Sequence, residues 1–179
     1  GNEGYLGLHR DTGVGVYLYP PSLWSVERSD AVTTSTEQDG NVTITTIRTP
    51  EGTLRSSTKY LPESFTRAYT KHFVTSADDL PAMRAWFRAR TVRPSFEAFE
   101  RIDGLWNGWG LPAALAPVSV SPLQSLIARW AGLETTIQIL MDAPDALEAT
   151  IHELEVLDDP IFEILCDSPA ELICFPENL

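Results

Sequence analysis

The chain has 179 residues, of which 43% are hydrophobic and 21% charged, and its formal net charge is −12. This length and composition are typical of a globular protein whose single domain buries a sizeable core. The excess of acidic residues argues against binding to nucleic acids or anionic membranes, because both attract clustered Lys and Arg.

Features of the sequence that report on location favour a cytoplasmic, soluble protein. No apolar run approaches the roughly 18 residues that a membrane span needs, and no signal-peptide pattern opens the sequence. Cys166 and Cys174 lack C-x-x-C spacing and a nearby His, so we expect two buried free thiols. Because Gly1-Asn-Glu-Gly4 does not resemble a natural start, we expect further residues to precede it.

Residues 1–75 are expected to form an antiparallel β-rich segment. Thr- and Val-rich stretches at 31–37 and 42–48 flank Gln38-Asp-Gly-Asn41, and this arrangement predicts a hairpin. Thr49-Pro-Glu-Gly52 predicts a second turn, since Pro and Gly suit its inner positions. Further strands are expected at 14–19, 53–58 and 69–75.

From residue 76 onward the hydrophobic pattern predicts helices interrupted by two strands. Ser76-Ala-Asp-Asp79 is typical of a helix start and Pro94-Ser95 of a helix end. Ser121, followed by Pro122, predicts a helix N-cap. The expected helices cover 76–93, 96–104, 122–130, 134–141, 144–158 and 159–165, and the expected strands cover 114–120 and 171–175.

The order strand, helices, strand predicts a right-handed crossover between parallel strands. The expected fold class is therefore α/β, a partial TIM-type (β/α) barrel over residues 76–179 beside the antiparallel segment over residues 1–75. Active sites of such barrels lie at the carboxyl ends of the strands. An incomplete barrel leaves sheet edges unpaired, so we expect self-association to cover them.

Polar residues follow both expected barrel strands and are the candidate contacts to a small-molecule substrate. Ser119, Ser121 and Gln124 follow the first strand, and Glu177 and Asn178 follow the second. The alternative interpretation makes Ser121 a helix cap alone and makes Glu177 and Asn178 a solvated tip.

The segment Trp106-Asn-Gly-Trp-Gly110 is a Gly-rich aromatic loop. Trp106 and Trp109 could line an apolar pocket for a flat ligand. The alternative is a structural loop whose indole rings cover the side of the barrel.

No catalytic residue can be assigned from the sequence, because no nucleophile–base pair, carboxylate pair or metal cluster can be assembled. The motif His152-Glu153 lacks the second His of a zinc protease. The three histidines are isolated, and the four clustered arginines are expected to form a solvated structural face at a helix end. These residues are His9, His72, His152, Arg84, Arg88, Arg90 and Arg93.

Five short pieces between residue 42 and the C-terminus carry a resemblance to a known family. They are Thr49-Pro-Glu-Gly-Thr-Leu54, Ser76-Ala-Asp-Asp-Leu80, Ser121-Pro-Leu-Gln124 with Gly132, Asp142-Ala-Pro-Asp-Ala-Leu147 and Phe175-Pro-Glu-Asn178. Together, and in this order, they resemble the uroporphyrinogen decarboxylase superfamily. The superfamily includes the decarboxylase of haem biosynthesis and the methyltransferases that serve corrinoid proteins. The resemblance implies a TIM-type barrel, which typically needs about 250 residues, so the chain would be a middle section of one.

The resemblance is closer to the methyltransferase branch than to the decarboxylase. The decarboxylase carries a substrate-facing Tyr six residues after a Pro, and here that position is Ala128. Its basic N-terminal loop and its late His also lack counterparts. The turn Thr49-Pro-Glu-Gly-Thr-Leu54 looks more like the methyltransferase-related branches, whose zinc-binding His and Cys residues lie beyond Leu179.

The resemblance therefore implies part of an enzyme that moves a methyl group between a small donor or thiol and a corrinoid. Zinc and a corrinoid would be cofactors of the full-length protein, with no cofactor in this chain, and a corrinoid protein would be a partner. One alternative is uroporphyrinogen decarboxylation, a lyase step of porphyrin biosynthesis, although a substrate with many carboxylates needs converging Arg and Lys. The other is a non-catalytic binding or structural module. Alone, the 179-residue chain is expected to be inactive.

Overall fold

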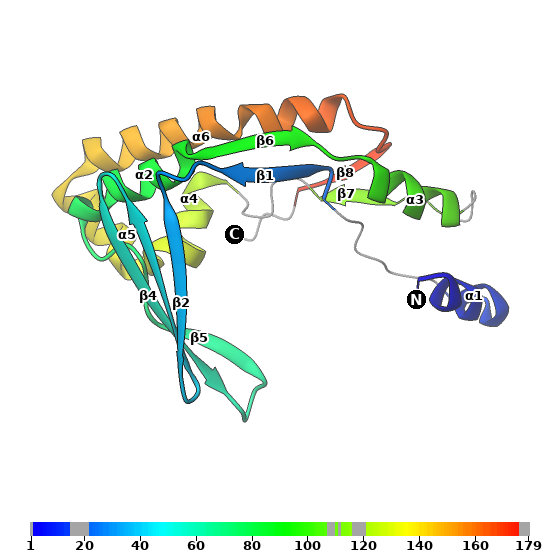
Figure 1. The fold of residues 1–179 in the computed structure, drawn as a ribbon, viewed down its shortest axis with the longest axis horizontal. Helices are drawn as coiled ribbons and strands as arrows, with labels where there is room; N and C mark the ends of the chain where they lie inside the picture. The colour runs from blue at the N-terminus through cyan, green and yellow to red at the C-terminus, as the bar shows by residue number, and fades with distance from the viewer. Residues whose placement is uncertain (1, 15–21, 107–109, 111, 116–120, 176–179) are drawn as a thin grey trace. The chain divides into compact units, whose positions relative to one another are not determined.

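The computed structural model describes residues 2–14, 22–106, 110, 112–115 and 121–175. Its helices are α1 (Asn2–Thr12), α2 (Leu80–Arg88), α3 (Glu97–Trp106), α4 (Pro122–Ser125), α5 (Gly132–Asp142) and α6 (Pro144–Cys166) (Figure 1). Its strands are β1 (Trp24–Arg28), β2 (Thr33–Asp39), β3 (Val42–Thr49), β4 (Gly52–Leu61), β5 (Thr66–Lys71), β6 (Arg90–Pro94), β7 (Ala113–Leu115) and β8 (Leu172–Cys174). A 3-10 turn (Ala77–Asp79) precedes α2, and a π-helical turn (Leu126–Trp130) follows α4.

The chain divides into two compact units. The first unit comprises Gly1–Val26, Val92–Val118 and Asp159–Glu177, and the second comprises Glu27–Thr91, Ser119–Asp158 and Asn178–Leu179. Strands β1 and β6 and helix α6 therefore each run from one unit into the other.

The second unit contains a four-stranded antiparallel sheet in the order β2-β3-β4-β5. The predicted hairpin is confirmed, with Gly40 at φ 56° in the turn between β2 and β3. Ile47 pairs with Leu54 across β3 and β4, and both side chains are buried. In Figure 1 the turn between β3 and β4 lies beside α2, whereas the other two turns lie at the far end of the sheet. The edge strands β2 and β5 are exposed along their whole length.

The helices of the second unit bury one continuous apolar cluster. Leu80 and Met83 of α2 are fully buried, as their three-residue spacing predicts for one helix face. The cluster is completed by residues of the sheet, of the segment between β5 and α2, of the π-helical turn and of α5 and α6. These include Ile47, Leu54, Val74, Leu126, Trp130, Ile139, Leu147 and Leu154.

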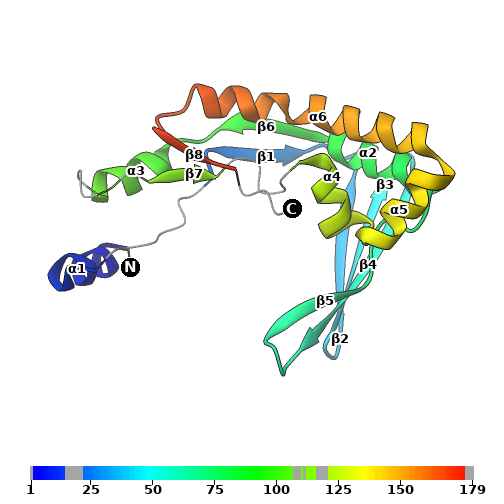
Figure 2. The ribbon, with the colours of Figure 1, turned by 180° about the vertical axis from the view of Figure 1, so that it is seen from behind.

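The first unit contains a two-stranded parallel pair, in which Ala114 of β7 lies opposite Ile173 of β8. Figure 2 shows the two strands side by side. The predicted parallel pairing of these two segments is confirmed. Phe99, Ala114 and Leu165 belong to the core cluster beside the pair, and a smaller cluster joins α1 to α3.

The expected partial TIM-type barrel is wrong. Within the described part of the chain, β7 and β8 form the only parallel pair, and the four-stranded sheet is antiparallel. Strands β1 and β6 also run antiparallel, since Ser29 N donates to Ala89 O (2.9 Å) and Ser95 N donates to Leu23 O (2.8 Å). Residues 90–94 therefore pair back onto an earlier strand instead of continuing a barrel. Self-association of the chain stays a prediction.

Several expected elements also differ from the structure, and residues 116–120 of the strand expected at 114–120 lie outside the described residues. The helix expected over 76–93 ends at Arg88, because Arg90–Pro94 is extended and paired with β1. Helix α6 continues through Pro160, where packing of Ile161 and Leu165 into the core outweighs the lost backbone hydrogen bond. Helix α1 replaces part of the expected β segment, and residues 15–19 of the expected strand at 14–19 lie outside the described residues.

Candidate functional site

Ser121 and Gln124 meet at the start of α4. The Ser121 hydroxyl accepts a hydrogen bond from the backbone N–H of Gln124 at 3.3 Å, and Pro122 occupies the first turn. The predicted N-cap is confirmed. The capping bond fixes the first turn of α4 and leaves the Gln124 side chain half-buried.

Trp106 ends α3 and lies in the core of the first unit. Its side chain is only 8% exposed and packs with Leu6 and Ile102. A Cβ atom added to Gly110 would lie 2.6 Å from Cζ3 of the indole, so this close approach requires glycine. Trp106 itself thus packs in the core of the first unit, and residues 107–109 of the aromatic loop lie outside the described residues.

The remaining candidate residues are Trp109, Ser119, Glu177 and Asn178. All four lie outside the described residues. Of the seven candidates, the structure therefore brings together Ser121 and Gln124 and places Trp106 in a core.

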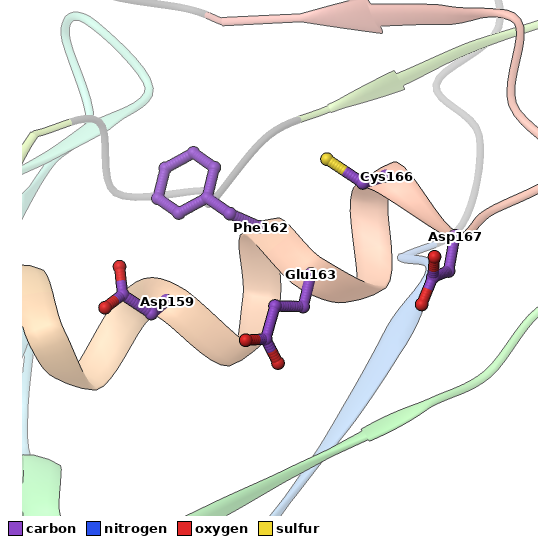
Figure 3. Close-up of a pocket in the computed structure, with 5 residues that line it drawn as sticks. All are labelled: Asp159, Phe162, Glu163, Cys166 and Asp167. Atoms are coloured by element: carbon purple, nitrogen blue, oxygen red, sulfur yellow. The ribbon is translucent and has the colours of Figure 1, made fainter.

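A pocket that the sequence does not predict lies on the C-terminal part of α6, within the first unit. It has a volume of about 490 Å³ and is lined by Asp159, Phe162, Glu163, Cys166 and Asp167. Asp159, Glu163 and Asp167 are four residues apart, as are Phe162 and Cys166, which is the spacing of residues that share a helix face. Figure 3 shows Phe162 and Cys166 projecting to one side of α6 and the Glu163 carboxylate to another. The Phe162 ring stacks on Phe175 with centroids 6.2 Å apart.

The pocket lining offers three carboxylates, one thiol and one aromatic ring. It contains no His, Lys or Arg, so the lining residues offer Cys166 neither the histidine base nor the neighbouring positive charge that commonly activates a thiol nucleophile. Cys166 and Cys174 are both exposed free thiols, and the expectation that they are buried is wrong. On β8 the inward side chain is Ile173, so its neighbour Cys174 faces outward.

Three of the four arginines of the expected basic cluster, Arg84, Arg88 and Arg90, form ion pairs within the second unit. Arg88 pairs with Glu153 of α6 and with Glu51 of the turn between β3 and β4 (2.8 Å), and Arg84 lies 3.5 Å from Glu153. Hydrogen bonding to Glu153 raises the pKa of Arg88, and the same bond lowers the pKa of Glu153. The arginines are thus structural, as expected, but they are paired with carboxylates and not merely solvated.

Arg28 and Arg90 also make structural contacts within the second unit. Arg28 lies over the Trp86 ring, 3.8 Å from its centroid, and donates to the Trp86 carbonyl. Burial lowers the pKa of Arg28, and the nearby charge of Arg90 lowers it further. Arg90 donates to the Leu157 carbonyl and to the Asp158 carboxylate.

Charged residues are distributed unevenly along the sequence. Residues 130–179 contain twelve Asp and Glu residues and no Lys or Arg, whereas residues 1–129 contain thirteen of each class. The whole formal net charge of −12 therefore resides in the C-terminal segment that forms α5, α6 and β8.

The described residues do not fit a zinc site. Within the parts of the chain that the structure describes, no group of three or more His, Cys, Asp or Glu side chains could hold a metal ion. We therefore assign no zinc ligand. The same residues include no helix that is both long and apolar enough to cross a membrane.

Comparison with known protein families, with curated proteins and with solved structures finds no match to this chain.

Proposed function

We propose that the chain contributes substrate-binding residues to a methyl-transfer enzyme related to the uroporphyrinogen decarboxylase superfamily. The observation that carries this proposal is the parallel pairing of β7 with β8. Parallel strands have their carboxyl ends at one edge of the sheet, and α/β proteins bind small molecules outside that edge. In the sequence, Ser119, Ser121 and Gln124 follow β7, and Glu177 and Asn178 follow β8; the proposal uses this order along the chain alone.

The positions of the resembling pieces support the relationship. Thr49-Pro-Glu-Gly52 forms the turn between β3 and β4, and Ser76-Ala-Asp-Asp79 precedes α2. Ser121 caps α4, and Gly132, at φ 79°, begins α5. Asp142-Ala-Pro-Asp145 contains the break between α5 and α6. Four of the five resembling pieces thus lie at a described turn, cap or helix boundary.

In this proposal the chain's residues bind and orient a small methyl donor or acceptor. The Ser121 cap fixes the first turn of α4, and the Gln124 amide, which can both donate and accept a hydrogen bond, holds the polar part of that molecule. A bound corrinoid, carried by a partner protein, would supply the metal that takes up or releases the methyl group.

The charge distribution favours methyl transfer over decarboxylation of a tetrapyrrole. A substrate with many carboxylates requires several Arg or Lys side chains around it. Residues 130–179 contain neither, and Ala128 offers no hydroxyl where the decarboxylase has a tyrosine. We also propose a cytoplasmic location, since the exposed thiols of Cys166 and Cys174 stay reduced in that compartment.

The test uses the protein encoded by the complete reading frame. It is incubated with a methylated corrinoid protein plus a thiol acceptor, and separately with uroporphyrinogen. Demethylation is followed by the corrinoid absorbance and decarboxylation by the mass of the porphyrinogen. The proposal expects demethylation alone. Loss of carboxylates from uroporphyrinogen would establish the alternative chemistry, and no turnover in either mixture would favour a non-catalytic module.

A further inference from the structure

Helix α5 exposes an apolar stripe on the surface of the second unit. Leu133, Ile137 and Met141 form one row at four-residue spacing, and Leu140 lies beside them. The exposed fraction of the side chain is 59% for Leu133, 47% for Ile137, 78% for Met141 and 54% for Leu140. The helix already buries Thr136 and Ile139 against the core, so the stripe is additional to the packed face.

A polar row that carries two carboxylates, the acidic row, runs directly along this stripe. Glu134, Gln138 and Asp142 are also four residues apart and lie one residue further along the helix than the apolar row, so the two rows are adjacent. All three side chains are exposed. The first turns of α6 add the exposed Asp145 and Glu148, and no Lys or Arg follows Arg129 in the sequence.

We propose that the α5 stripe, defined as Leu133, Ile137, Leu140 and Met141, docks a basic amphipathic helix of a partner protein. An amphipathic helix recognises such a surface by laying its apolar face on the stripe. Lys or Arg residues flanking that face would meet Glu134 and Asp142, which gives the charge complementarity that selects the partner. The surface does not depend on the methyl-transfer proposal.

Charge also disfavours two other occupants of this exposed apolar face, a second copy of the chain and an anionic lipid surface. A second copy of the chain would bring its own Glu134 and Asp142 against the same residues, with no Lys or Arg on α5 to offset them. The four side chains also expose only a few hundred Å², well below the roughly 800 Å² per partner of a stable dimer. An anionic lipid surface would be repelled by the same carboxylates.

The test measures binding of a labelled Leu/Lys amphipathic peptide of about 18 residues, long enough to form a helix when bound. A second peptide with every Lys replaced by Glu is the probe control. Fluorescence anisotropy at about 0.05 and 0.5 M salt separates the charge contribution from the apolar one. The variants are Ile137→Ser/Met141→Ser for the stripe and Glu134→Gln/Asp142→Asn for the acidic row.

Two matched control variants make the test specific. Val156→Ser removes an apolar side chain of similar exposure (53%) from α6, and Glu37→Gln/Asp39→Asn changes the net charge equally on the exposed strand β2. We expect the stripe variant to bind the Leu/Lys peptide about tenfold more weakly, because two exposed apolar contacts are lost. We expect the acidic-row variant to lose about threefold at low salt and less at high salt. Both controls should bind as the unaltered chain does.

The proposal is overturned if the Leu/Glu peptide binds as tightly as the Leu/Lys peptide, or if the controls weaken binding as much as the stripe variant. It is also overturned if sedimentation shows a dimer that Ile137→Ser/Met141→Ser dissociates, because the stripe would then join two copies. Since all four changed side chains are exposed, a native circular dichroism spectrum is expected for each variant.

Discussion

Arg88 and Glu153 form a two-point ion pair between α2 and α6. The Arg88 Nε donates to one carboxylate oxygen of Glu153, and Nη2 donates to the other at 3.0 Å. Through Nη1 the same guanidinium reaches Glu51 at 2.8 Å. One side chain thus connects two helices with the turn between β3 and β4 inside the second unit.

The first prediction concerns the pH dependence of this pair. The hydrogen bond from Arg88 lowers the pKa of Glu153 below its ordinary value of 4.5, so its carboxylate stabilises the fold above that pH. The stabilisation is lost as the pH falls through the lower pKa of the folded state. We expect Glu153→Gln to reduce the free energy of unfolding by about 1 kcal/mol at pH 7, as measured by urea denaturation.

The control for this prediction is the same unfolding measurement at low pH. Below the folded-state pKa of Glu153 both proteins carry a neutral side chain at position 153, so the difference in unfolding free energy should vanish. Glu155→Gln, which changes an exposed carboxylate of the same helix, should have little effect at either pH. A Glu153→Gln difference that persists unchanged at low pH would show that the ion pair does not cause it.

The second prediction concerns the buried pair Arg90–Asp158. Their side chains are only 10% and 17% exposed, so removing Arg90 leaves a desolvated carboxylate without its partner. We expect Arg90→Met to lower the free energy of unfolding by about 3 kcal/mol. Replacing both charges, as Arg90→Met/Asp158→Leu, should recover most of that loss, since neither charge of the pair is then left without its partner. Equal losses in the single and double variants would contradict this account.

The third prediction concerns Gly132 at the start of α5. Its φ is 79°, and an added Cβ would lie 3.0 Å from Cδ2 and Nε2 of His72. The His72 ring is held by stacking on Tyr69 and by a 3.2 Å contact between Nδ1 and the Arg129 carbonyl. We expect Gly132→Ala to lower the free energy of unfolding, measured by thermal or chemical denaturation, by about 2 kcal/mol or more. The left-handed backbone conformation alone accounts for about 2 kcal/mol.

A second glycine supplies the comparison. Gly104 lies within α3, and an added Cβ there meets nothing within 4 Å. Gly104→Ala should therefore stabilise the chain by up to about 1 kcal/mol. If both substitutions shift stability in the same direction, the conformation of Gly132 described above is incorrect.

Local signals in the sequence were sufficient for several elements. The hairpin of β2 and β3 follows from Gln38-Asp-Gly-Asn41 and alternating Thr and Ile, and the α4 cap follows from Ser121-Pro122, because turns and caps depend on neighbouring residues. The pairing of β7 with β8 followed from the crossover rule.

The remaining features depend on contacts between distant residues. Arg90–Pro94 is short and polar, and it becomes a strand only by pairing with β1. Helix α6 passes through Pro160 because of the core beneath Ile161. The pocket on α6 has a helical spacing of Asp159, Glu163 and Asp167 that the sequence could have shown, but its aromatic stack depends on where β8 brings Phe175.

The measurement that tests the functional account most directly compares Gln124→Leu with Gln138→Leu in the methyl-transfer assay of the complete protein. Gln124 follows β7 within the first turn of α4, whereas Gln138 lies exposed on α5. We expect Gln124→Leu to raise KM for the small substrate about tenfold, because about one hydrogen bond to the substrate is lost. We expect Gln138→Leu to leave KM unchanged. Unaltered KM for Gln124→Leu, or equal effects of the two changes, would contradict the assignment of this part of the chain to substrate binding.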